Sequence, residues 1–100
     1  MAASEQLARR LAAAHREALA VGDSPLRADR LADQLPGVMA MLEGEDLDDI
    51  TRNRVHDALA AAERALRRDD DGREAARHLA AAMRLTENRP KAPSPFLDDD

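Results

Sequence analysis

The amino-acid sequence predicts an all-α protein, a small four-helix bundle of two antiparallel helical hairpins followed by a disordered C-terminal tail. Three observations lead to this fold class. Half of the apolar residues are alanine, only one of the 100 residues is aromatic, and there is no cysteine. Apolar residues recur at the three-to-four-residue period of an amphipathic helix in four stretches. Glycine, proline or clustered aspartates separate these stretches and are typical of helix ends and turns.

The first helix is predicted over residues 5–21. Ser4 is a good N-cap, and Leu7 and Leu11 begin the apolar stripe that faces the core. Gly22 follows, and glycine tolerates the left-handed conformation that commonly ends a helix.

The second helix begins at Ser24-Pro25, because serine caps a helix well and proline suits its first position. Its stripe continues through Leu35 to Leu42, but Pro36-Gly37 interrupts it. Proline removes a backbone donor and disfavours helix at the preceding residue. We expect either a kinked helix or a helix over 25–35 followed by a short one over 37–43, and we favour the break near Pro36.

The third and fourth helices form the second predicted hairpin. An acidic connection over 43–49 precedes the third helix, which runs to about Arg68. Asp71 and Glu74 have the spacing of a capping box at the start of the fourth helix, which runs to about Thr86. Because the turn between these helices is so short, we expect them to pack antiparallel.

The composition of the chain divides it into two parts, a helical bundle over 1–87 and a Pro-rich acidic tail over 88–100.

The predicted core is small, because between Glu5 and Asn88 there are only 19 Leu, Ile, Val and Met residues. At about 1.5–3 kcal/mol for each fully buried side chain, this is a thin core. We therefore expect either marginal stability as a lone monomer or stabilisation by self-association or by a partner.

Charge and composition argue against several functions. The net charge of −5 opposes nucleic-acid binding. Residues 27–42 could be a degenerate helix-turn-helix, but the supposed recognition helix carries no side chain suited to reading bases. The acidic runs do not have the spacing of a calcium-binding loop. The start of the chain turns charged within ten residues, and no apolar run could cross a membrane, so we expect a cytoplasmic protein.

Chemistry-bearing residues are few, and we expect no enzyme, no catalytic residues, no metal, no cofactor and no small-molecule ligand. His15, His56 and His78 lie on separate predicted helices, without the close histidine partner that helical metal sites favour. The serines and Thr51 are placed to cap helices or lie in the tail, and no nucleophile–base pair emerges.

Two groups of residues are candidates for binding a protein partner. Phe96 and Leu97, followed by three aspartates, resemble a short linear motif with an apolar anchor and a steering charge. Arg64, Arg67 and Arg68 form the densest basic cluster, although favourable interaction with the C-terminal end of their helix also accounts for them.

Residues 50–89, from Ile50-Thr51-Arg52-Asn53-Arg54-Val55 to Arg89, resemble small helical proteins of actinobacterial conflict systems, which are encoded beside caspase-like and TPR-containing proteins. The resemblance covers less than half of the chain and lacks the tryptophan expected early in such a segment. It implies a small accessory protein of a bacterial conflict or defence system.

Together these observations predict a non-enzymatic intracellular helical accessory module that binds itself or a larger protein. The alternative is an acidic transcription-linked regulator or an antitoxin-like protein with a degenerate helix-turn-helix, whose acidic domain neutralises a basic partner.

Overall fold

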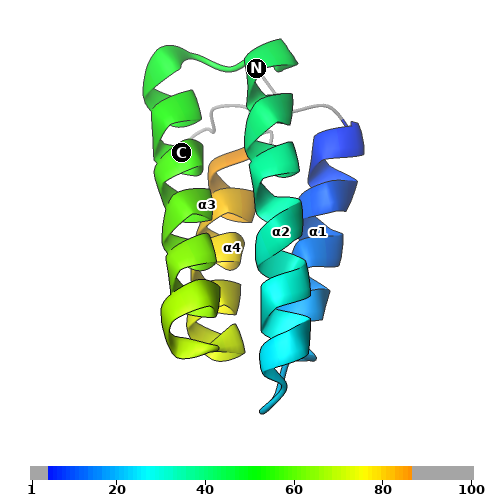
Figure 1. Ribbon diagram of the computed structural model, residues 1–100. Helices are drawn as coiled ribbons and strands as arrows, with labels where there is room; N and C mark the ends of the chain where they lie inside the picture. Colours follow the sequence, from blue (N-terminus) through cyan, green and yellow to red (C-terminus); the bar gives the residue numbers. More distant parts are fainter. Residues whose placement is uncertain (1–4, 87–100) are drawn as a thin grey trace, which may run out of the picture.

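Four helices run alternately up and down and pack side by side in the computed structural model, which describes residues 5–86 (Figure 1). In chain order the elements are α1 (Glu5–Leu19), α2 (Pro25–Met41), the 3-10 helix η1 (Leu42–Gly44), α3 (Asp49–Asp69) and α4 (Gly72–Thr86). The all-α four-helix fold predicted from the sequence is confirmed. The tail expected over 88–100 lies outside the described residues.

The helices form a closed ring of neighbours. The contact between α3 and α4 is the most extensive, as expected for the short turn that joins them. The next is between α1 and α4, the first and last helices of the chain, followed by α2 with α3 and α1 with α2. The two predicted hairpins are therefore closed into one bundle by the long-range packing of α1 on α4.

Local capping fixes the helix ends close to the predicted positions. Gly22, after α1, has φ 56°, the left-handed conformation expected there. The Ser24 hydroxyl accepts from the Arg27 amide at 3.3 Å and caps α2. The Asp71 carboxylate accepts from the Glu74 amide at 3.0 Å at the start of α4, which is the first half of the predicted capping box. The last residue of α1 is Leu19, two residues before the predicted end.

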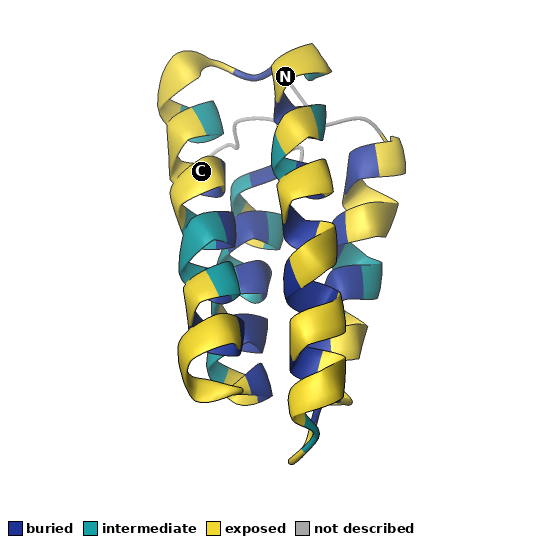
Figure 2. Cartoon of the chain, viewed as in Figure 1, coloured by how far each residue is buried: buried dark blue, intermediate teal, exposed yellow. Residues whose placement is uncertain are grey.

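The buried residues lie on the inward faces of the four helices (Figure 2), and the side chains of this core are aliphatic. Leucine supplies most of the volume, and alanine lets the helices approach closely. The largest fully buried side chains are Leu7, Leu11, Leu31, Leu35, Val38, Leu42, Val55, Leu59, Leu66 and Leu79. As the composition indicated, this core holds no aromatic side chain among the described residues.

The predicted break of the second helix near Pro36 is wrong. The α-helix α2 continues from Pro25 through Pro36 to Met41. Leu35 and Val38, on either side of the proline, are buried in the common core, whereas Pro36 itself is exposed. Burial on both sides of Pro36 outweighs the roughly 3 kcal/mol helix penalty of proline, and the exposed side of the helix can lose a backbone hydrogen bond to water. A turn at Pro36-Gly37, which a helix-turn-helix would require, is absent.

Candidate functional site

A shallow groove of about 430 Å³ runs along the surface between α1 and α4. Both helices contribute to it because they pack antiparallel, so the last turns of α1 lie beside the first turns of α4. Its lining residues are His15, Leu19, Arg73, Ala76, Arg77 and Ala80. None of these residues carries a carboxylate, although the whole protein has a net charge of −5.

The floor of the groove is apolar. Ala76 is buried and Ala80 half-buried, so their methyl groups offer little height above the helix backbone. Leu19 is 61% exposed, one of the few large apolar side chains in residues 5–86 that the core leaves in solvent. Small residues beside an exposed leucine form a surface into which a larger apolar side chain can pack.

The rim of the groove is basic. Arg73 and Arg77 lie four residues apart on α4 and thus on the same face. Arg77 contacts Glu74 at 3.3 Å, in an ion pair whose arginine side chain is 76% exposed. The Arg73 guanidinium has no hydrogen bond or ion pair with another residue in the described part of the chain. An incoming carboxylate therefore meets one free guanidinium and one held only by a solvent-exposed pair, which is weak.

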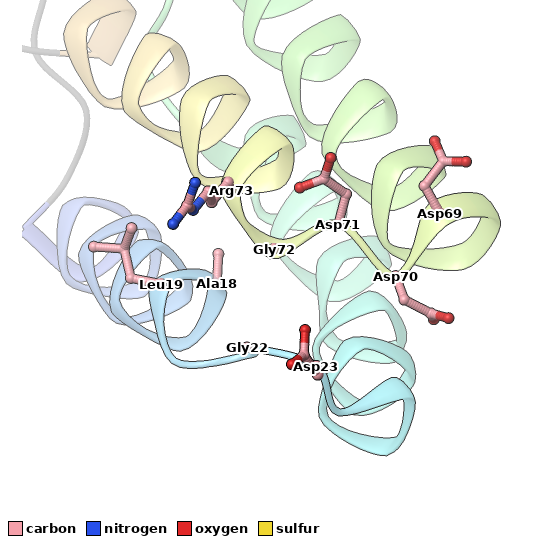
Figure 3. Close-up of a pocket in the computed structure, with 9 residues that line it drawn as sticks. All are labelled: Ala18, Leu19, Gly22, Asp23, Asp69, Asp70, Asp71, Gly72 and Arg73. Atoms are coloured by element: carbon pink, nitrogen blue, oxygen red, sulfur yellow. The ribbon is translucent and has the colours of Figure 1, made fainter.

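The groove adjoins a second hollow of about 420 Å³ at the end of the bundle where the α1–α2 and α3–α4 turns meet (Figure 3). Leu19 and Arg73 line both hollows. Four aspartates, at positions 23, 69, 70 and 71, also line the second one. Asp69 and Asp70 point away from Leu19 and Arg73, and the Arg73 side chain extends toward α1 (Figure 3). The negative charge of this second hollow therefore comes mainly from Asp23 and Asp71.

Backbone packing at Gly72 holds the two helices of the groove together. Gly72 is buried, and a Cβ added there would overlap the carbonyl oxygen of Ala18 and lie 2.7 Å from the Cβ of Val21. Only glycine permits this approach of the first turn of α4 to the end of α1. Arg73, the next residue, is thereby fixed beside Leu19.

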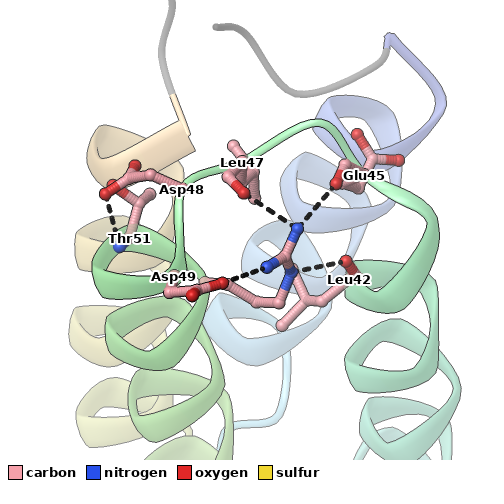
Figure 4. A network of polar contacts seen from close by, with 7 residues as sticks. Leu42, Glu45, Leu47, Asp48, Asp49 and Thr51 are labelled. Carbon is pink, nitrogen blue, oxygen red and sulfur yellow. Dashed lines mark hydrogen bonds and ion pairs between the residues drawn. The ribbon is translucent and has the colours of Figure 1, made fainter.

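At the opposite end of the bundle, Arg52 joins the α2–α3 connection to α3 (Figure 4). Its guanidinium donates to the carbonyl oxygens of Leu42 at 3.1 Å, Glu45 at 2.9 Å and Leu47 at 2.8 Å, and to the Asp49 carboxylate at 3.1 Å. These contacts tie the carbonyl oxygens of the connection to α3, and the Leu42 carbonyl also accepts from the Glu45 amide at 3.1 Å. Arg52 is therefore used in holding the connection.

Asp48 caps α3 next to this network. Its carboxylate accepts from the Thr51 amide at 3.4 Å. Hydrogen bonding from Thr51 lowers the pKa of Asp48 below its ordinary value of 3.8. The ionised form is thus favoured at the positive N-terminal end of the helix.

The three arginines of the predicted basic cluster lie within little more than one turn of α3, but they differ in their contacts. Arg67 donates to Glu63 at 2.8 Å and to Asp33 of α2 at 3.1 Å, and these bonds raise the pKa of Arg67. Arg67 therefore links α3 to α2. Arg64 and Arg68 are exposed and form no ion pair within residues 5–86. Phe96 and Leu97, the other predicted binding residues, lie outside the described residues.

The described residues contain no group of three or more His, Asp, Glu or Cys side chains that could hold a metal ion. His78 contacts Glu74 at 3.1 Å along α4, His15 lines the groove, and His56 is exposed on α3. No helix within residues 5–86 is long and apolar enough to cross a membrane.

Sequence reasoning did not identify Leu19, Arg73 and Arg77 as one surface. Arg73 and Arg77 share a face by their spacing alone, and Leu19 follows His15 at one helical turn. The sequence alone did not indicate that α1 packs against α4, which lies more than fifty residues away in the chain.

Comparison with protein-family models, with curated proteins and with solved structures finds no match for this chain.

Proposed function

We propose that the protein is a small, non-enzymatic helical interaction module that binds a larger protein through the α1/α4 groove. The setting proposed from the sequence is the bacterial cytoplasm, as an accessory protein of a conflict or defence system. The observation that carries the proposal is the combination of exposed Leu19 and a floor of small residues with the basic rim of Arg73 and Arg77.

The chemistry of the groove defines the partner segment. A bulky apolar side chain fits over Ala76 and Ala80, and neighbouring carboxylates fit Arg73 and Arg77. Arginine recognises carboxylates with two parallel donors, which adds orientation to attraction. The partner should therefore present an apolar residue close to two or more acidic ones.

Affinity capture with matched charge-neutralising variants tests this proposal. The tagged full-length protein is compared with Arg73→Gln/Arg77→Gln and with the control Arg64→Gln/Arg68→Gln, which removes the same charge from exposed positions of α3 and at the same time tests the binding residues predicted from the sequence. Support requires a stoichiometric protein partner that the control retains and the groove variant loses. Capture that is equal in both variants, or no stoichiometric partner at all, would contradict the proposal.

A further inference from the structure

We propose that residues 96–100 of this chain, Phe96-Leu97-Asp98-Asp99-Asp100, dock intramolecularly into the α1/α4 groove and compete there with the partner. The competition rests on the proposed function. The docking does not, because it involves this chain alone.

Residues 96–100 carry the two kinds of group that fit the groove, large apolar side chains and carboxylates. Phe96 and Leu97 are adjacent large apolar residues, and Phe96 is the only aromatic residue of the chain. Three consecutive carboxylates follow them. The groove offers a floor of small side chains, two arginines and no carboxylate of its own among its lining residues.

The direction of the segment is compatible with the groove, because its carboxylates come last and Arg73 is the groove residue of α4 farthest from Thr86. A chain that leaves α4 at Thr86 and turns back along the helix meets Ala80 first, then Arg77 and Ala76, and finally Arg73. Residues 96–100 present their apolar pair first and their carboxylates afterwards. Docking in this direction places Phe96 over Ala80 and the aspartates beside Arg77 and Arg73.

Nine residues, 87–95, connect α4 to Phe96. An extended chain of about ten residue steps spans up to roughly 33 Å, at about 3.3 Å per residue. Ala80 lies six residues before Thr86 on α4, which is only about 9 Å along the helix axis. The connection is therefore long enough for the segment to return to the groove.

Tethering also favours docking within one chain over docking between two copies. A connection of only nine residues gives the joined groups an effective concentration in the millimolar range. A contact too weak to join separate molecules at micromolar concentration is then substantially occupied within one chain.

The sole phenylalanine provides the test. The full-length protein is labelled at alanine and leucine methyl groups, and its NMR spectrum is compared with that of Phe96→Leu, which keeps an apolar side chain but removes the phenyl ring current. The difference between the two spectra excludes the contribution of the His15 ring, which both proteins share. Docking predicts Phe96-dependent shifts of the methyl signals of Leu19, Ala76 and Ala80 that do not change on dilution.

The variants used for affinity capture add a charge criterion. Arg73→Gln/Arg77→Gln should lower the docking equilibrium constant about fivefold, since two exposed ion pairs are lost, whereas Arg64→Gln/Arg68→Gln should leave it unchanged. Circular dichroism checks that all variants keep their helix content. Phe96-dependent shifts that are absent, lie on other faces, or grow with protein concentration would overturn intramolecular docking. Failure here with a successful groove-dependent capture would refute the docking and leave the proposed function standing.

Discussion

The backbone of Gly72 lies so close to the carbonyl oxygen of Ala18 that no side chain fits between them. This contact joins the start of α4 to the end of α1, two elements distant in the chain. It closes the bundle and sets Arg73 beside Leu19 at one end of the groove.

Gly72→Ala should therefore destabilise the protein. Alanine gains up to about 1 kcal/mol of helix propensity over glycine, but the overlap is with backbone, which cannot move aside cheaply. We expect a net loss of about 3 kcal/mol and a fall in Tm of more than about 10 °C. The matched control is Gly37→Ala at an exposed position of α2, where the added Cβ would lie 4.0 Å from the Arg10 guanidinium. This control should raise stability slightly, and equal effects at both glycines would contradict the packing described.

Pro36→Ala should stabilise the protein, because it restores an amide that can donate to the carbonyl of Ala32 within a continuous helix. The helix penalty of proline is about 3 kcal/mol, partly offset by the rigidity that proline gives to the unfolded chain. We expect a gain of about 2 kcal/mol in urea unfolding. A loss of stability would instead indicate that the protein requires a break at Pro36.

Arg52→Ala should loosen the connection between α2 and α3. It removes the guanidinium hydrogen bonds to the carbonyl oxygens of Leu42, Glu45 and Leu47, although partial exposure of the site lets water replace some of these bonds. We expect a loss of about 2 kcal/mol and faster hydrogen exchange confined to residues 42–52. Arg54→Ala, an exposed arginine on the same helix turn, is the control and should change neither quantity.

The capping carboxylate of Asp48 should contribute to the acid sensitivity of the protein. Its pKa is lowered in the folded state, so its stabilisation is present above pH 3.8 and is lost as the pH falls through the folded pKa. Asp48→Asn keeps a good N-cap but not the charge. The Tm difference between the wild type and this variant should be largest near neutral pH and shrink below pH 3.8. A difference independent of pH would contradict this role of Asp48.

The sequence was sufficient for the local part of the fold and insufficient for its long-range part. Ser24, Asp71 and Gly22 act on neighbouring residues, so their roles at helix ends could be predicted from spacing. Pro36 was misjudged because its local penalty was weighed without the burial of Leu35 and Val38 in a shared core. The groove was missed for the same reason, since it exists only where α1 meets α4.

The basic cluster illustrates the limit for binding residues. Arg64, Arg67 and Arg68 are close in sequence, yet Arg67 is tied to Glu63 and Asp33 while the other two are exposed. The spacing of charged residues in the chain shows that a region is basic, but it does not show which of the arginines form ion pairs in the folded protein. That distinction required the packing of α3 on α2.

The central claim is that the α1/α4 groove is the binding surface, and the dissociation constant of the captured partner tests it most directly. Titration calorimetry would compare the wild type with Arg73→Gln/Arg77→Gln and with Arg64→Gln/Arg68→Gln under identical salt conditions. We predict a Kd at least about tenfold weaker for the groove variant, equivalent to about 1.4 kcal/mol, and an unchanged Kd for the control. The same Kd for all three proteins would show that the partner binds elsewhere.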